Sequence, residues 1–106
     1  MKILIIEDDQ MVANIYRNKF AHKGFNAETA PDGEVGLELV GSFRPDVVLL
    51  DLALPRLSGL EVMRSIRAQK EFEELPIIVF SNTYLTQLVQ DAWKANLKDA
   101  SGKAIY

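Results

Sequence analysis

Four short apolar segments recur along the chain, and each is followed by a stretch in which apolar residues have helical spacing. Three of the four are almost continuous in Ile, Leu and Val, which is typical of strands buried on both faces of a parallel sheet. The expected strands are residues Lys2–Ile6, 26–29, 46–50 and 76–80. Their alternation with helices predicts an α/β fold, in which helices cover both faces of a parallel sheet through right-handed crossovers.

The segments between these strands place apolar residues three and four positions apart, as amphipathic helices do. The expected helices are residues 10–23, 34–40, 58–70 and 84–95. The first should be capped by the carboxylate of Asp9 and followed by Gly24, a typical residue after a helix C-terminus. Its apolar stripe toward the sheet would comprise Met11, Val12, Ile15, Tyr16 and Phe20.

Length and composition narrow the class of protein. The 106 residues suit one domain, which we take to be residues 1–106. A net charge of −3 argues against direct binding to nucleic acid, and the lack of cysteine excludes disulfides and thiolate chemistry. The N-terminus does not read as a signal peptide, and no apolar run approaches the ~20 residues that span a membrane. We therefore expect a cytoplasmic protein with no membrane contact.

Acidic residues follow two of the expected strands. Glu7 and Asp8 come directly after the first strand, and Asp51 ends the third. The binding crevice of an open α/β sheet lies beyond the carboxyl ends of its strands, so these carboxylates would converge there if the two strands are neighbours. Three ionised carboxylates would repel one another, and a hard cation such as Mg²⁺ would relieve that repulsion. Each residue taken alone could instead cap a helix or turn, or lie on a solvated surface.

Two further polar residues extend this group. Ser81 follows the fourth expected strand, and Lys103 lies in residues 100–105, which could form a weak fifth strand. A carboxylate nucleophile, a cation, a hydroxyl and an ammonium group together suit phosphoryl transfer to Asp51 with formation of an aspartyl phosphate. Taken singly, Ser81 would be an ordinary strand-end hydroxyl and Lys103 a surface residue, so the combination carries the argument.

With these positions placed, the chain resembles the receiver domain of bacterial two-component response regulators. The resemblance lies in the opening strand with its acidic residues, a turn, a block around Asp51, and the fourth strand. The segments are residues 2–9, 30–34, 45–51 with Leu54, Pro55 and Gly59, and 76–81. The resemblance implies a doubly wound, flavodoxin-like parallel sheet with strand order 2-1-3-4-5.

The resemblance also implies roles. Asp51 would accept a phosphoryl group from the phosphohistidine of a sensor histidine kinase or a histidine phosphotransfer protein. Phosphorylation of Asp51 would then alter a surface that binds a downstream protein effector. Mg²⁺ would be held by Glu7, Asp8, Asp51 and the backbone carbonyl of Ala53. Ser81 and Lys103 would contact the phosphoryl group. Such a domain assists its own phosphorylation and dephosphorylation but is not a conventional turnover enzyme.

The C-terminal part departs from the family pattern. Asn82, Ala100, Gly102 and Ala104 stand where the family usually has a small residue, an aromatic residue, an apolar residue and a proline. No residues remain for a fifth helix, so a single helix would cover one face of the sheet. We expect that a second copy or a partner chain covers this face, that the natural protein continues beyond Tyr106, or that the end of the chain is altered.

The sequence also allows other functions. A phosphorylation-independent interaction domain, or pseudo-receiver, would keep the fold and fits the irregular C-terminal part. A phosphatase with an aspartate nucleophile commonly needs a second acid two residues later, where this chain has Ala53. A nucleotide or flavin binder would need a glycine-rich loop after the first strand, where this chain has three acids.

Overall fold

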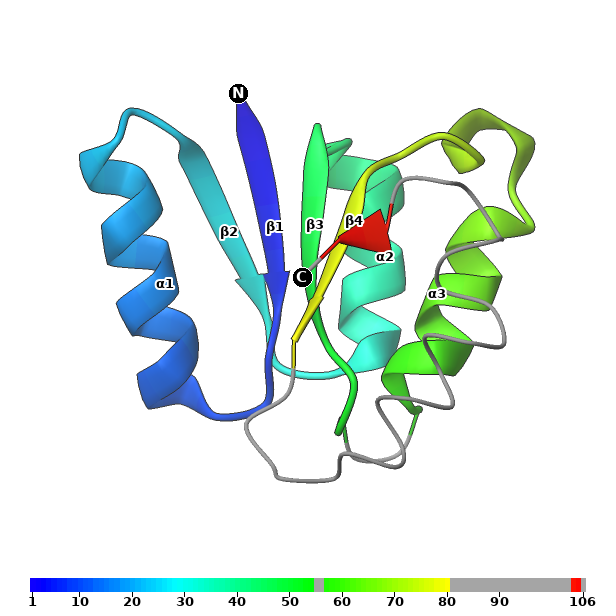
Figure 1. The fold of residues 1–106 in the computed structure, drawn as a ribbon, viewed down its shortest axis with the longest axis horizontal. Coiled ribbons are helices and arrows are strands. Elements are labelled where there is room, and N and C mark those ends of the chain that lie inside the picture. The colour runs from blue at the N-terminus through cyan, green and yellow to red at the C-terminus, as the bar shows by residue number, and fades with distance from the viewer. Residues whose placement is uncertain (55–56, 81–103, 106) are drawn as a thin grey trace.

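A five-stranded parallel sheet lies between helices in the computed structural model, which describes residues 1–54, 57–80 and 104–105 (Figure 1). The strand order is β2-β1-β3-β4-β5, so the predicted α/β fold and the order 2-1-3-4-5 are confirmed. The strands are β1 (Lys2–Ile6), β2 (Asn26–Ala30), β3 (Val47–Asp51), β4 (Ile77–Phe80) and β5 (Ala104–Ile105). The weak fifth strand amounts to two residues beside β4, and no fifth helix follows it in the described part of the chain.

The helices that connect successive strands are α1 (Gln10–His22), α2 (Gly33–Phe43), α3 (Gly59–Arg67) and the short 3-10 helix η1 (Lys70–Phe72). α1 lies on one face of the sheet and α2 and α3 lie on the other. α3 ends three residues before the predicted limit, because Gln69 is extended (φ −90°, ψ 120°) and a separate 3-10 helix begins at Lys70. The expected helix at residues 84–95 lies outside the described residues. None of the helices in the described ranges is long and apolar enough to cross a membrane.

Side-chain caps fix where each helix begins. Asp9 accepts hydrogen bonds from the backbone N–H groups of Met11 (2.9 Å) and Val12 (3.3 Å), which confirms its predicted capping role. Asp32 caps α2 in the same way, through the N–H of Val35 at 2.9 Å. α1 ends before Gly24, whose φ of +89° lies in the left-handed region that glycine adopts without strain. These local signals place the strand-to-helix turns at one edge of the sheet.

The larger core lies between the sheet and the helices α2 and α3. Alternate strand residues face it, including Leu4 and Ile6 of β1 and Val48 and Leu50 of β3, and all four are fully buried. The opposite face carries the smaller cluster of Ile3, Ile5 and Leu49. Because both faces are covered, the strands read as continuous apolar runs in the sequence.

α1 covers the second face, and its orientation corrects part of the predicted apolar stripe. Ala13 is fully buried, and Tyr16 and Phe20 pack toward the sheet, with the Tyr16 ring 5.4 Å from that of Phe80. Met11 and Ile15 are 74% and 51% exposed, so their predicted burial is wrong. The side of the helix that faces the sheet contains residues 13, 16 and 20. Met11 and Ile15 each lie two positions from Ala13 and therefore point away from the sheet.

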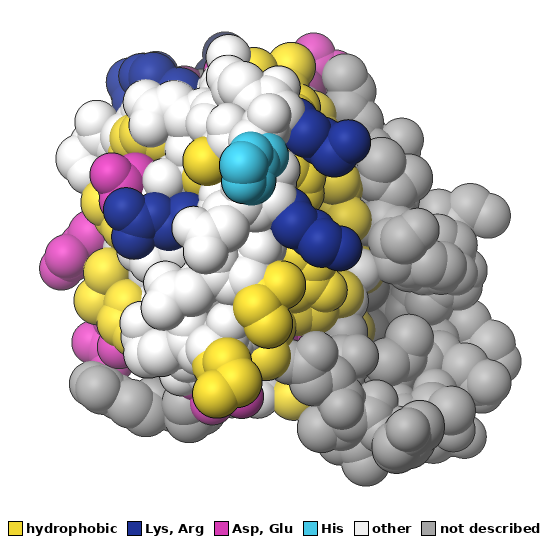
Figure 2. Space-filling model, turned by 90° about the vertical axis from the view of Figure 1, so that its left-hand side faces the viewer, with side chains coloured by type: hydrophobic (Ala, Val, Ile, Leu, Met, Phe, Trp, Pro, Cys, Tyr) yellow, Lys and Arg dark blue, Asp and Glu magenta, His cyan; other side chains and the backbone are white. Residues whose placement is uncertain are grey.

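Apolar side chains therefore remain visible on the α1 side of the molecule, beside polar and basic ones (Figure 2). α1 is the one helix of the described residues that packs on this face. A second copy or a partner that covers this face stays a prediction.

Candidate functional site

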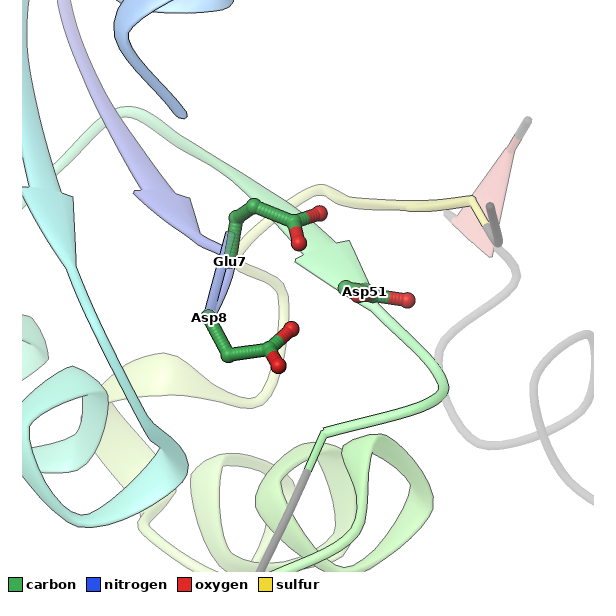
Figure 3. A group of neighbouring side chains, drawn as sticks. All are labelled: Glu7, Asp8 and Asp51. Atoms are coloured by element: carbon green, nitrogen blue, oxygen red, sulfur yellow. The ribbon is translucent and has the colours of Figure 1, made fainter. Parts of the chain in front are cut away.

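The predicted convergence of acidic residues is present at the carboxyl ends of β1 and β3. These strands are parallel neighbours, with Ile6 opposite Leu50, so Glu7 and Asp51 occupy adjacent strand ends. Their side chains and that of Asp8 turn toward the same space (Figure 3). One carboxylate oxygen from each of the three residues lies within 4.8 Å of the other two. The sequence prediction of a three-carboxylate cluster is thereby confirmed in its geometry.

The cluster combines two buried carboxylates with one that is open to water. Glu7 and Asp51 are 0% and 2% exposed, and no other charged residue of the described ranges is buried, whereas Asp8 is exposed. Oε1 of Glu7 accepts a hydrogen bond from the N–H of Asp9 at 3.0 Å. Oδ1 of Asp51 accepts one from the N–H of Ala53, also at 3.0 Å. The two buried groups are thus held by backbone donors, and Asp8 offers a route for exchange with solvent.

Backbone hydrogen bonds fix the turns that carry these carboxylates. The N–H of Glu7 donates to the carbonyl of Ala30 at 3.0 Å, which extends the pairing of β1 with β2 past the end of the strand. The N–H of Leu52 donates to the carbonyl of Phe80 at 2.9 Å and does the same for β3 and β4. The two acidic turns therefore have a defined separation before any ligand binds.

Burial changes the protonation of the cluster. The pKa of Glu7 is raised to about 7, mainly by desolvation and also by the nearby Asp51 carboxylate, while the hydrogen bond from Asp9 acts in the opposite direction. Burial also raises the pKa of Asp51, with a further contribution from the charge of Asp8, while hydrogen bonds from Ala53 and Glu7 lower it. Below about pH 7, Glu7 therefore carries a proton beside Asp51 when no cation is bound. Sequence reasoning missed this proton, because complete burial of Glu7 leaves no signal in the local pattern.

The donor set fits a hard divalent cation. All three groups offer carboxylate oxygens, the ligands that Mg²⁺ prefers, and the exposed side of the cluster leaves room for water ligands. The raised pKa of Glu7 indicates that positive charge is lacking beside these carboxylates, and a bound cation would supply it. Glu7, Asp8 and Asp51 are the residues that could hold it. Ala53 follows Asp51 within the same turn, and the role of its carbonyl stays a prediction.

Two predicted site residues, Ser81 and Lys103, lie outside the described residues. The strand before Ser81 is nevertheless described, and its last residue, Phe80, pairs with Asp51 in the sheet. β5 begins at Ala104, directly after Lys103 in the sequence, and pairs with β4. Their predicted contacts with a phosphoryl group stay predictions.

The parallel sheet in this strand order, with acidic residues at the ends of the neighbouring strands β1 and β3, matches a class of signalling domain. The family model of the response regulator receiver domain matches residues 3–105, and the chain belongs to this family. Among curated relatives, the response regulator MprA of Mycolicibacterium vanbaalenii is 41% identical over 81 residues, which are 76% of this chain and 34% of that protein. The chain thus spans about a third of the length of the curated relatives it matches.

Solved structures agree with this assignment. The response regulator TrrA of Thermotoga maritima, in complex with Mg²⁺ and BeF, is 26% identical and has a TM-score of 0.77 over 98% of this chain and 84% of its own. The receiver domain of a sensor histidine kinase from Pseudomonas aeruginosa, which has a magnesium ion coordinated in its active site cleft, is also 26% identical. Its TM-score is 0.80 over 90% of this chain and 78% of its own.

Proposed function

We propose that this chain is a phosphoacceptor domain that takes a phosphoryl group onto Asp51 from a phosphohistidine. The donor would be a sensor histidine kinase or a histidine phosphotransfer protein. The observation that carries the proposal is a buried aspartate within 4.8 Å of two further carboxylates, at the edge where the acidic turns of the sheet meet. Mg²⁺ in the two solved relatives supports the same use of this cluster.

The residues of this chain can be assigned to steps of the transfer. The N–H of Ala53 holds Oδ1 of Asp51 and so fixes the carboxylate, and we assign Oδ2 as the nucleophile. Its attack forms an O–P bond while the N–P bond of the phosphohistidine breaks, and the departing imidazole nitrogen keeps the electron pair of that bond and takes a proton from solvent. Bound Mg²⁺ would neutralise the carboxylates and the negative charge on the phosphoryl oxygens.

Glu7 and Asp8 prepare the site for this chemistry. Both would hold the cation, and Asp8, which is exposed, would do so where water also reaches it. Glu7 must release its proton as the cation binds, because a protonated carboxyl is a poor ligand. Binding of Mg²⁺ and loss of the proton are therefore linked, and the site is assembled more readily above pH 7 than below it.

The output of the domain follows from the same proposal. Ser81 and Lys103 would bond phosphoryl oxygens, and the new charge would shift the equilibrium of a nearby surface toward the form that a downstream protein effector binds. The domain would assist its own phosphorylation and dephosphorylation without being a conventional turnover enzyme. Its cytoplasmic location and the absence of direct nucleic acid binding stay predictions.

The test is phosphorylation by a small acyl phosphate in the presence of Mg²⁺, followed by intact-protein mass spectrometry. We expect the mass of one phosphoryl group to be added to the wild type and not to Asp51→Asn. Asp46→Asn is a matched control, because Asp46 is an exposed aspartate that precedes the other end of β3. A wild type that gains no mass with any donor would contradict the proposal and favour a phosphorylation-independent interaction domain.

A further inference from the structure

The first residue of α3 packs directly against the turn that carries Asp51. A Cβ atom placed on Gly59 would lie 2.5 Å from the carbonyl oxygen of Asp51 and 2.7 Å from Cα of Leu52. The N–H of Gly59 donates to the carbonyl of Leu52 at 3.3 Å. The φ of Gly59 lies outside the left-handed region, so glycine is needed here for space rather than for backbone conformation.

The other side of this turn is also fixed. Leu52 donates its N–H to the carbonyl of Phe80 in β4, and its side chain is buried in the larger core. The turn therefore lies between β4 and the start of α3, with a backbone contact on each side. A displacement of the turn would move the Asp51 carboxylate and the peptide of Ala53 together, because the N–H of Ala53 bonds Oδ1 of Asp51.

We propose that Gly59 is a positioning residue for Asp51. Its missing side chain lets the start of α3 press on the Asp51–Leu52 peptide, and this contact sets the distance from the Asp51 carboxylate to those of Glu7 and Asp8. Gly59 would in this way determine the affinity of the cluster for Mg²⁺ without touching the ion. The inference rests on the proposed function of the cluster.

Other glycines of the chain offer matched controls. A Cβ atom on Gly36 of α2 would lie 2.6 Å from Cδ1 and 3.0 Å from Cγ1 of Ile6, a similarly short contact, but with a side chain rather than with backbone. A Cβ atom on Gly41 would meet nothing within 4 Å. Gly36→Ala therefore adds a clash away from the Asp51 turn, and Gly41→Ala adds the same methyl group with no clash.

The variant test measures Mg²⁺ affinity by isothermal titration calorimetry, at a temperature where circular dichroism shows each variant to be folded. We expect Gly59→Ala to weaken Mg²⁺ binding about tenfold or more, since displacements near 1 Å have effects of this size or larger in preorganised sites. Gly36→Ala should lower the melting temperature and leave the Mg²⁺ affinity within about twofold of the wild type. Gly59→Ala with unchanged affinity would overturn the inference. A wild type that binds no Mg²⁺ would instead overturn the proposed function.

A second measurement uses the wild type and so does not depend on the folding of a variant. Coupling between two sites is reciprocal, so if the Gly59 contact favours Mg²⁺ binding, Mg²⁺ must stabilise the Gly59 contact. We expect saturating Mg²⁺ to slow hydrogen exchange of the Gly59 amide severalfold. The Gly36 amide, which donates to the carbonyl of Asp32, serves as the control and should change less. Equal changes at the two amides would overturn the inference.

Discussion

The buried proton of Glu7 leads to a prediction about how stability depends on pH. The pKa of Glu7 is about 7 in the folded protein and 4.5 in its ordinary state. Between these pH values the folded protein binds more protons than the unfolded chain, so the free energy of unfolding must fall as pH rises. The stabilising effect is complete below pH 4.5 and is lost once the pH passes about 7.

The size of the effect follows from the same two values. At about 1.4 kcal/mol for each unit of pKa, the difference between 4.5 and about 7 amounts to roughly 3 kcal/mol of lost stability. Glu7→Gln removes the ionisable group and keeps an oxygen that can accept the hydrogen bond from Asp9. We expect this variant, without metal, to be more stable than the wild type at pH 8 by up to about 3 kcal/mol and to lack this contribution to the pH slope.

The assay is urea unfolding followed by circular dichroism at several pH values between 5 and 8, in buffer containing a chelator. The control is Glu38→Gln, which changes an exposed carboxylate on α2 and should keep the slope of the wild type. With Mg²⁺, the stability advantage of Glu7→Gln over the wild type at pH 8 should shrink. The variant has lost one of three carboxylate ligands, so Mg²⁺ stabilises it less than the wild type. Equal pH slopes in the metal-free wild type and Glu7→Gln would refute this reasoning.

Four further substitutions test the fold, each by urea unfolding in the absence of metal. Gly41→Ala should raise the free energy of unfolding by about 0.5–1 kcal/mol, because glycine inside a helix is unfavourable and the new Cβ has space. Asp9→Ala should lower it by about 1 kcal/mol through loss of the α1 cap, and no loss would contradict that role. Ile6→Ala should cost about 2–5 kcal/mol because Ile6 is fully buried, whereas Ile15→Ala should cost well under half as much; similar costs would show that the exposed placement of Ile15 is wrong.

Much of the architecture was predictable because it rests on local signals. The apolar strands lie within about one residue of their expected limits, since runs of Ile, Leu and Val between turn residues have few other uses. Asp9 and Gly24 mark the ends of α1 by capping and by backbone conformation, which are properties of single residues. Met11 and Ile15 are exposed, although they belong to an apolar stripe of the α1 sequence. A helix rich in apolar residues has several possible stripes, and only its docking on the sheet selects one.

The sequence alone determined which groups would reach the candidate site. Carboxylates that directly follow two buried strands must emerge at the carboxyl edge of a parallel sheet, whatever the details of packing. The strand order came from the family resemblance, and the fold confirmed it. Tertiary structure decided the protonation of Glu7 and the position of Asp51. Glu7 binds its proton because neighbouring elements exclude water from it, and Asp51 takes its position from a turn held between β4 and the start of α3. Desolvation and backbone contact arise from segments distant in the sequence, so no local pattern contains them.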